Sequence, residues 1–310
     1  MALIYHNGRF IPEEKIQKAS AGDRVLLLLR SFLDKNEPGL VRFLVTTWQS
    51  QGNAITYKEL REAILSGAID EKILLDWMQD YSRFVIDYML PAWEKAMKAG
   101  TEELGKKFPN WRFDPMGDAV LAWTKAHSAA FVTNVTNTQI EALRAVVSRA
   151  AVLEDLSVDE LARAIRPMVG LTKPQATANI NYYQKLRAGG MSPKKAQASA
   201  ARYAARQHRH RAYTVARTEL ATAYNTGAYE GTKQAQAAGL MGETMKIWCT
   251  AFDERVCPVC GDLEGVEVGM DDDFNGASSS WSTKKHPPVH PGCRCAVIFE
   301  EISPPKKIQD

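Results

Sequence analysis

Long hydrophobic runs are absent from this chain of 310 residues. Its two most apolar stretches, VLLLLRSFL at 25–33 and LVRFLVTTW at 40–48, are each interrupted by an arginine. A helix that crosses a membrane needs about 20 apolar residues in succession. The N-terminus MALIYHNGRF also lacks the basic, apolar and small-residue regions of a secretory signal. We therefore expect synthesis in a cytoplasm and no membrane partner.

Cysteine is missing from the whole chain before Cys249, and all five cysteines lie between Cys249 and Cys295. An odd number of cysteines in a chain without a secretory signal argues against a disulfide framework. Their crowding beside histidines favours a metal site instead. Cys249 itself lies in an apolar, strand-like run, which predicts a buried thiol.

Charge of one sign does not dominate the chain either, since its net charge is +3. Apolar residues make up 45% and charged residues 24%, as in an ordinary soluble globular protein. These values exclude a disordered or collagen-like chain. The small positive charge does not by itself indicate a nucleic-acid partner.

Helical periodicity is the main signal in the first hundred residues. Apolar residues of EKILLDWMQDYSRFVIDYMLPAW (71–93) form one helical stripe, which Pro91 should break or kink. The following KAGTEELGKKFPNWRFDPMGD (98–118) is rich in Gly and Pro and predicts a loop or an interdomain connection.

Three capping boxes mark helix starts in the middle of the chain: Thr138 with Glu141, Ser157 with Glu160, and Thr172 with Gln175. They predict helices over 138–151, 157–168 and 173–188. A further helix over 193–238, which we expect to be broken, begins at a serine followed by proline.

Segments whose sequence predicts β-strands come last in the chain, at 245–252, 265–268 and 295–302. The fold class that follows is α+β and mostly α. We expect an N-terminal helical domain over 1–130 and a C-terminal module of helices and a small sheet over 131–303, closed by a zinc knuckle. Residues 304–310 read as a tail.

No acidic residue occurs from 188 to 218, where Lys195, Arg202, Arg206 and Arg209 share one face of the predicted helix. One interpretation is a solvated surface helix. The other is an electrostatic surface for DNA phosphates or an acidic partner protein. The chain has no recognition-helix motif, so base-specific contacts are not predicted.

Two short knuckles, CPVC and HPGC, supply four ligands for one structural zinc ion per chain: Cys257, Cys260, His290 and Cys293. Alternate residues of a strand point to opposite faces, so we expect Cys293 and Cys295 not to bind together and keep Cys295 as the substitute. His286, before two prolines, reads as a loop residue.

Catalytic zinc motifs are absent. The chain has neither the H-E-x-x-H of metalloproteases nor the H-x-E of zinc deaminases. Four protein ligands would leave no position for an activated water. Only about fifteen residues follow Cys295, where a nuclease of the histidine-metal type would need further ligands. We therefore expect no enzyme.

The late motifs resemble, in order and spacing, the Mu F-like head morphogenesis family of tailed bacteriophages. They are ARTELATAYNTGAYEG (216–231), KIWCTAFDERVCPVCGDLEG (246–265) and PPVHPGCRC (287–295). The matching positions are Arg217, Glu219, Asn225, Gly227, Lys246, Trp248, Asp253, Arg255, Cys257, Cys260, Leu263, Gly265, His290, Pro291, Cys293, Arg294 and Cys295.

This resemblance implies a minor head protein of the virion, present in few copies at the portal vertex and in the head interior. It also implies a role in head assembly, and for some relatives exit with the DNA. The expected partners are the portal protein, the major capsid or scaffold protein, and packaged double-stranded DNA without sequence preference. We expect the first 130 residues to contact portal, capsid or scaffold.

Five polar residues in these motifs allow two interpretations: Arg217, Glu219, Asn225, Asp253 and Arg255. They could form an active site or a buried network that ties helix to sheet, and we favour the network because buried charges persist when paired. The alternatives that remain for the whole chain are a DNA-binding zinc module acting through the basic helix and a metal-dependent nuclease.

Overall fold

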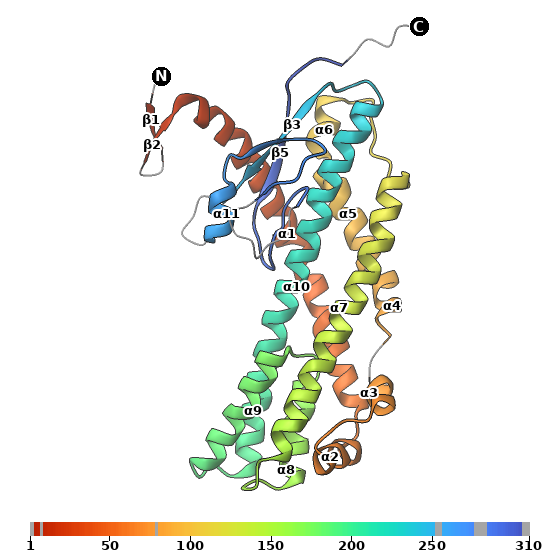
Figure 1. The fold of residues 1–310 in the computed structure, drawn as a ribbon, viewed down its shortest axis with the longest axis vertical. Coiled ribbons are helices and arrows are strands. Elements are labelled where there is room, and N and C mark those ends of the chain that lie inside the picture. The colour runs from red at the N-terminus through yellow and green to blue at the C-terminus, as the bar shows by residue number, and fades with distance from the viewer. Residues whose placement is uncertain (1–2, 7–8, 78–79, 252–255, 276–283, 306–310) are drawn as a thin grey trace. The chain divides into compact units, whose positions relative to one another are not determined.

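The computed structural model describes residues 3–6, 9–77, 80–251, 256–275 and 284–305, with side chains from residue 21 onward (Figure 1). Contacts divide the chain into two compact units. Unit 1 comprises Met1–Glu37, Met89–Trp123 and Thr214–Asp310. Unit 2 comprises Pro38–Tyr88 and Thr124–Tyr213. The predicted class is confirmed to the extent that the described chain is mostly helical with a small antiparallel sheet.

Three long helices each contribute residues to both units: α1 (Glu13–Ala54), α7 (Asp118–Ala151) and α10 (Pro193–Ala237). The chain thus leaves unit 1 along α1 and returns to it later, so neither unit coincides with the predicted division near residue 130. Whether 1–130 and 131–303 act as separate domains stays a prediction. Among the described helices, none has the length and apolarity that a membrane crossing requires.

Two of the predicted capping boxes are confirmed. Ser157 Oγ accepts a hydrogen bond from the Glu160 amide at the start of α8 (Val158–Ile165), and the Glu160 carboxylate accepts one from the Ser157 amide. Thr172 and Gln175 form the same box at the start of α9 (Lys173–Ala188). An unpredicted third box opens α2 (Tyr57–Ser66) at Thr56. These boxes satisfy amides that the first helical turn leaves unpaired.

Two predictions about the long helices are wrong. Thr138 lies inside α7, where its hydroxyl donates to the Asn134 carbonyl at 2.7 Å instead of capping a new helix. A threonine within a helix can satisfy its hydroxyl in this way, so the sequence box alone did not decide the start. The helix over 193–238 is also unbroken, since α10 runs without interruption from Pro193 to Ala237.

The single helical stripe predicted over 71–93 is divided into several elements. They are α3 (Glu71–Trp77), α4 (Tyr81–Phe84), a π-helix (Val85–Met89) and α5 (Leu90–Gly100). Pro91 lies in the first turn of α5, directly after the π-helix. Proline cannot donate a backbone hydrogen bond, so the predicted disturbance takes the form of a change in helix type.

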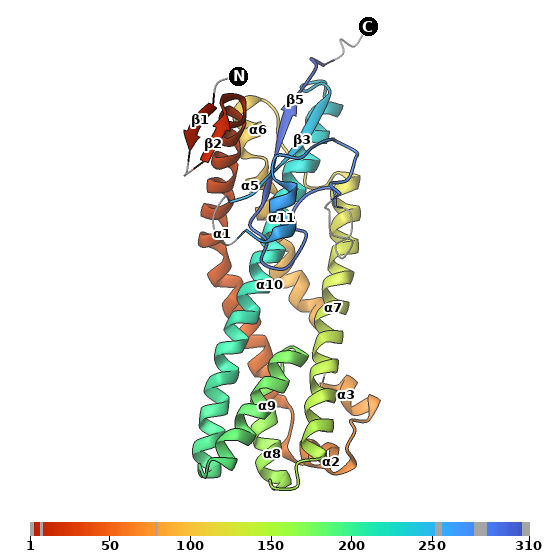
Figure 2. The ribbon, with the colours of Figure 1, turned by 60° about the vertical axis from the view of Figure 1, so that its left-hand side comes forward.

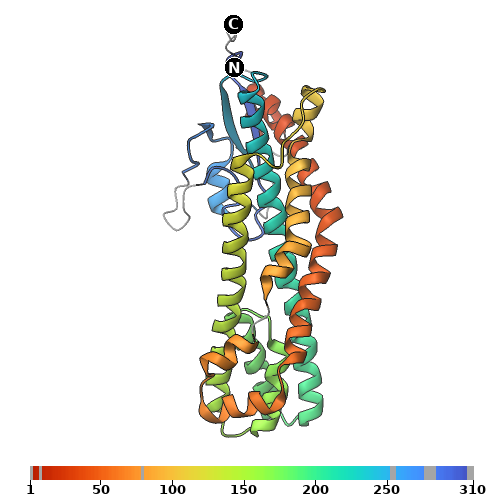
Figure 3. The same ribbon diagram turned by 90° about the vertical axis from the view of Figure 1, so that its right-hand side faces the viewer.

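The Gly- and Pro-rich segment 98–118 is helical in its first half rather than a loop or a connection between domains. α5 extends to Gly100 and α6 (Glu102–Lys107) follows. A side-chain atom at Gly100 would overlap the Tyr224 carbonyl, and one at Gly227 would overlap the backbone of Met97. These glycines let α5 and α10 approach closely within unit 1, where Figure 3 shows them side by side.

The sheet of unit 1 has the order β4-β3-β5, with antiparallel neighbours. Its strands are β3 (Thr244–Cys249), β4 (Glu267–Gly269) and β5 (Ala296–Glu301). All three lie within or near the predicted strand segments. The sheet and the short helix α11 (Pro258–Leu263) lie along the unit 1 half of α10 (Figure 2). A separate hairpin, β1 (Leu3–His6) with β2 (Arg9–Pro12), precedes α1.

Unit 2 is built from helices around an apolar core. α2, α3, α7, α8, the 3₁₀ turn Arg166–Met168, α9 and the first half of α10 contribute to it. Small side chains such as Ala196, Ala200 and Ala204 are fully buried on α10. They allow α9 to pack closely, with the Asn179 amide donating to the Ala200 carbonyl.

Candidate metal centre

The first knuckle is formed by the start of α11. Cys257 is the N-cap residue, and its sulfur accepts a hydrogen bond from the Cys260 amide at 3.4 Å. Pro258 occupies the first turn, where no backbone donor is needed. The spacing of CPVC thus brings both sulfurs to one side of a tight turn.

The second knuckle is a turn stabilised by α10. The Cys293 amide donates to the His290 carbonyl, and Gly292 adopts a positive φ of 74°. That backbone conformation favours glycine. The Gly292 amide donates to the Thr218 hydroxyl at 2.9 Å, which connects the turn to α10.

The two knuckles face one another. His290 Nε2 lies 3.1 Å from the Cys257 sulfur and 3.2 Å from the Cys260 sulfur. His290 Nδ1 lies 3.0 Å from the Pro291 carbonyl, which can only accept a hydrogen bond. Nδ1 therefore carries the proton, and the Nε2 lone pair is directed at the sulfurs. A carbonyl that fixes the tautomer in this way is typical of histidine metal ligands.

The sulfurs of Cys260 and Cys293 are 3.7 Å apart. Four ligands around zinc with Zn–S bonds of about 2.3 Å would place two sulfurs about 3.8 Å apart. The ligand atoms form two overlapping groups, one of Cys257, Cys260 and His290, the other of Cys260, Cys293 and Cys295, each within 4.8 Å. The described residues therefore form a cluster of possible metal ligands in which Cys260 belongs to both groups.

Cys295 lies closer to this centre than the sequence suggested. The expectation that it points away assumed that residues 293–295 are a strand, but β5 begins only at Ala296. Strand alternation therefore does not apply, and the sulfurs of Cys293 and Cys295 lie in the same group. The chain offers five ligand atoms for four tetrahedral positions.

Crowding of these sulfurs changes their acidity. Hydrogen bonds from the thiols of Cys260 and Cys295 lower the pKa of Cys293. The hydrogen bond to Cys293 raises the pKa of Cys260, and the hydrogen bonds to Cys260 and then Cys293, together with burial, raise the pKa of Cys295. All three cysteines are buried in an apolar cluster with Trp248 and Val297. Cysteine thiolates are the form that binds zinc.

Polar side chains of α10 hold the cysteine and histidine segment in place. Besides Thr218, the buried Asn225 amide donates to the Ala221 carbonyl at 2.9 Å and lies 3.5 Å from the Cys295 carbonyl. His286 Nε2 lies 3.2 Å from the Thr226 hydroxyl. His286 is thus a loop residue, as predicted, and it contacts α10, which was not predicted. It lies outside the two groups of possible ligands among the described residues.

Lys246 is a buried cation whose role the sequence did not reveal. Its side chain on β3 is fully buried, and Nζ donates to the carbonyls of Asp272 and Lys285 at 2.7 and 3.0 Å. Nζ also lies over the rings of Tyr229 and Phe274, at 5.3 and 5.2 Å. Burial lowers the pKa of Lys246 to about 8. Lys246 on β3 thus connects the sheet to the backbone at Asp272 and at Lys285, just before His286.

The five polar residues of the motifs have different surroundings. Arg217 donates to the carboxylate of Glu37 at 2.6 and 3.1 Å, and the Glu37 side chain is 1% exposed. Its partner therefore comes from α1, not from the late motifs, and no sequence signal indicated this. Asn225 contacts α10 and Cys295. Glu219 is half-buried on α10. Asp253 and Arg255 lie outside the described residues, so a network of all five stays a prediction.

Cys249 is a buried thiol at the end of β3, as expected. Burial raises its pKa to about 12, so it is protonated at neutral pH. α1 packs closely against it at Gly22. Cys249 is not part of either group of possible ligands among the described residues.

The predicted basic row is exposed on the unit 2 half of α10: Lys195, Arg202, Arg206 and Arg209. Arg211 belongs to the same basic sequence but is buried, and its guanidinium lies over the Trp48 ring and donates to the Gly170 carbonyl. The sequence without acidic residues is also longer than 188–218, because none occurs from 161 to 218.

Comparison with known protein families finds one match. Residues 146–298 match the family described as phage Mu protein F like protein. This range contains α8, α9, α10, the sheet except for its last residues, and every possible metal ligand described above. Comparisons with curated proteins and with solved structures gave no match.

Proposed function

The chain belongs to the phage Mu protein F-like family of phage head proteins, and on this premise we propose that it is a minor head protein acting in head morphogenesis at the portal vertex. The observation that supports this proposal is the extent of the match, which includes both the α10 scaffold and the clustered cysteines and histidine. Its partners would be the portal protein and the major capsid or scaffold protein. Its location would be the head interior, from which it could leave with the DNA.

The metal centre fits a structural role. Zinc would bind through Cys257, Cys260, His290 and one of Cys293 and Cys295, one ion per chain. Such a set fills all four tetrahedral positions with protein atoms and leaves none for a reacting water. We therefore propose that the protein is not an enzyme. A nicking assay with DNA and divalent metal tests the nuclease alternative, and any cleavage lost in Cys260→Ser would contradict this proposal.

Purified phage particles provide the direct test of the main proposal. Mass spectrometry should detect the chain in intact heads, and imaging with symmetry released should place it at the portal vertex. Deleting its gene should reduce the yield of infectious particles. Absence of the chain from purified heads would refute the proposal.

A second candidate function is non-specific contact with packaged double-stranded DNA through the basic row of α10. The exposed cations and the acid-free sequence favour it. Its affinity should fall steeply with salt, because each neutralised phosphate releases counterions. Unchanged binding after replacement of Arg202, Arg206 and Arg209 by alanine would exclude this surface.

A further inference from the structure

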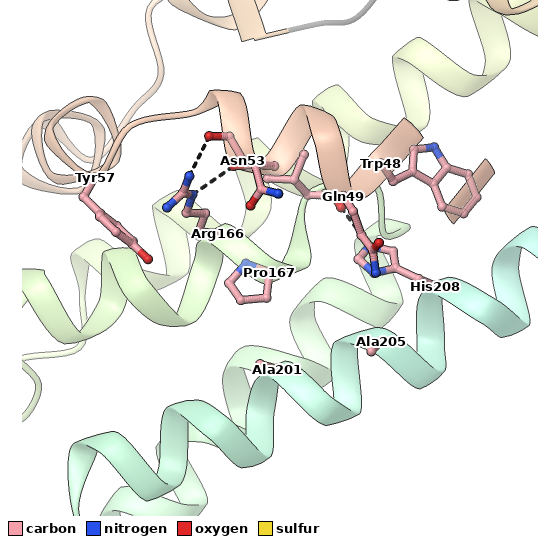
Figure 4. Close-up of a pocket in the computed structure, with 11 residues that line it drawn as sticks. Trp48, Gln49, Asn53, Tyr57, Arg166, Pro167, Ala201, Ala205 and His208 are labelled. Carbon is pink, nitrogen blue, oxygen red and sulfur yellow. Dashed lines mark hydrogen bonds between the residues drawn. The ribbon is translucent and has the colours of Figure 1, made fainter. Parts of the chain in front are cut away.

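A groove of about 350 Å³ opens in unit 2 between the end of α1 and the first half of α10 (Figure 4). Figure 4 shows Tyr57 and Arg166 at one end and His208 at the other, with Ala201 and Ala205 on the α10 side. The alanines leave the space that larger side chains would fill. The volume lies in the lower range of small-molecule sites.

One end of the groove combines a cation with an aromatic ring. The Arg166 guanidinium donates to the carbonyls of Gly52 and Asn53 at 3.0 and 2.6 Å, in the last turn of α1. This offsets the partial negative charge of that helix end, which would otherwise repel an anion. Arg166 also lies 4.7 Å from the Tyr57 ring centroid, and Arg163 lies 5.9 Å from it.

The basic row borders the groove on the α10 side. With 100° between successive helical residues, Ala201 and Ala205 lie between the buried Ala204 and the exposed Arg202 and Arg209. Arg206 continues the row and lies 5.6 Å from the Tyr203 ring centroid, and Tyr203 contacts Tyr182 of α9. This second group of cations and aromatic rings lies on the other side of the basic row, away from the groove, whose lining includes neither Tyr203 nor Tyr182.

Negative charge is absent from the α10 side of the groove, whereas near Tyr57 the Asp159 carboxylate forms an ion pair with Arg61. From 161 to 218 there is no acidic residue. Among the ion pairs of the described residues, none involves Lys195, Arg202, Arg206 or Arg209. An extended ligand that carries repeated negative charges matches the charge of this surface. Planar groups of such a ligand could stack on the aromatic rings.

We propose that this groove binds single-stranded nucleic acid, with phosphates along the basic row and an unstacked base in the groove beside Tyr57. Aromatic rings and arginine planes are the usual platforms for unpaired bases. Gln49 and Asn53, which also line the groove, carry amides that can pair with base edges. A duplex could use the row but not the groove, because its bases are stacked inside. The inference extends the second candidate function and does not depend on the metal centre.

Fluorescence anisotropy of the purified full chain tests this, using a labelled single strand of about 12 nucleotides. The same strand without bases and a duplex of equal length are the comparison probes. We expect the complete single strand to bind about tenfold more tightly than the abasic strand and more tightly than the duplex. Equal binding of the complete and abasic strands would overturn the proposal, and so would tighter binding of the duplex.

Two sets of variants locate the site. Ala201→Leu with Ala205→Leu fills the groove without changing charge and should lower affinity for the complete strand about tenfold, with little effect on the abasic strand. Tyr57→Ala, at an exposed position, should act in the same direction if the leucines impair folding. Replacing Arg202, Arg206 and Arg209 by alanine should reduce the salt slope by about 2.

A matched control removes three cations elsewhere: Arg30→Ala, Lys95→Ala and Lys98→Ala. It should bind nearly as the natural chain does, and thermal melting should show that every variant is folded. If the control loses as much affinity as the arginine variant, binding depends on net charge alone and the proposed site is refuted. Presence of the chain in phage heads is measured separately, so either proposal can fail without the other.

Discussion

The C-terminal part of unit 1 and the helices of unit 2 are stabilised in different ways. The described residues between 244 and 301 of unit 1 form three short strands and one short helix, connected through α10 hydroxyls, a buried lysine and the candidate metal ligands. Unit 2 contains a continuous apolar core and well-capped helices. Unit 2 has the larger apolar core, whereas the segment around the knuckles combines a small apolar cluster with specific polar contacts.

Chain connectivity explains this difference. About thirty residues separate the two knuckles, and closing a loop of that length costs conformational entropy. In the described part of this loop, the strand β4 and the end of α11 are the regular elements that can offset this cost. A metal ion at Cys260 and His290 would close it. From α7 to α10, by contrast, the helices of unit 2 follow one another through short connections, and an apolar core offsets the cost of closing its two parts.

Among the substitutions considered, replacement of Cys260 by serine should destabilise the segment around the knuckles the most, while leaving unit 2 folded. Cys260 lies in both ligand groups, and structural zinc contributes roughly 10–16 kcal/mol in small zinc domains. We expect loss of bound zinc, faster proteolysis within 257–293 and retained helical circular dichroism from unit 2. Cys249→Ala should keep one zinc per chain. Full zinc content in Cys260→Ser would contradict the site.

A second experiment tests which of Cys293 and Cys295 is the fourth ligand of the same centre. Cys293→Ser and Cys295→Ser should each retain zinc if the other sulfur takes the fourth position, whereas the double variant should lose it. Metal analysis of the three proteins decides this. Zinc loss in only one single variant would identify the ligand that binds.

Breaking the ion pair between Arg217 and Glu37 should have the next largest effect. Removing one partner leaves a buried charge uncompensated, which costs about 3–5 kcal/mol. Arg217→Ala should therefore lower the free energy of unfolding by that amount in urea denaturation. Replacing both residues, as Arg217→Met with Glu37→Leu, should recover most of it. A loss below about 1 kcal/mol in Arg217→Ala, as for exposed pairs, would show that the pair is not buried in solution.

Unit 2 should lose stability at acid pH through His208. Burial lowers the pKa of His208 to about 4, while its Nε2 donates to the Val169 carbonyl. In the unfolded chain this histidine takes up a proton near pH 6.5, but the folded protein does so only near pH 4. The free energy of unfolding should therefore fall by about 3 kcal/mol between these values. His208→Gln should remove this part of the pH dependence. Denaturation at pH 7, 5.5 and 4.5 measures the difference, and an equal slope in both proteins would contradict it.

The smallest effect concerns the helix caps. Ser157→Ala should lower the free energy of unfolding by about 1 kcal/mol, because it removes a side-chain cap. Thr138→Ala, at the box that is not a cap, should change it by less than about 0.5 kcal/mol. Equal losses in the two variants would mean that Ser157 does not cap α8 in solution.

Local sequence patterns predicted most of the elements. The boxes at Ser157 and Thr172 and the proline at 193 marked three helix starts, and the three late strands were found near their true positions. Thr138 was mistaken for a cap because the same residue pair also occurs inside helices. Gly100 suggested a loop, but in the structure it lets α10 approach α5 closely. A local sequence pattern cannot reveal a contact with a helix that is distant in sequence.

The candidate metal centre could be predicted because its ligands are close in sequence and chemically distinctive. Cys257, Cys260, His290 and Cys293 were predicted from spacing alone, and in the structure they belong to two groups of possible ligands that share Cys260. The position of Cys295 was misjudged, because it depends on where β5 begins. The partner of Arg217 could not be predicted, since Glu37 is 180 residues away and an isolated glutamate carries no signal.

The sequence by itself determined the helical class, the small sheet, the resemblance to the family and the cluster of cysteines and histidine that could bind a metal. These depend on periodicity, capping chemistry and the spacing of cysteines, all of which act over a few residues. Only the tertiary structure decided the two interleaved units, the burial of Lys246, the pairing of Arg217 with α1 and the groove beside Arg166. Each of these arises where helices distant in sequence pack together, and the packing depends on the shape of whole surfaces.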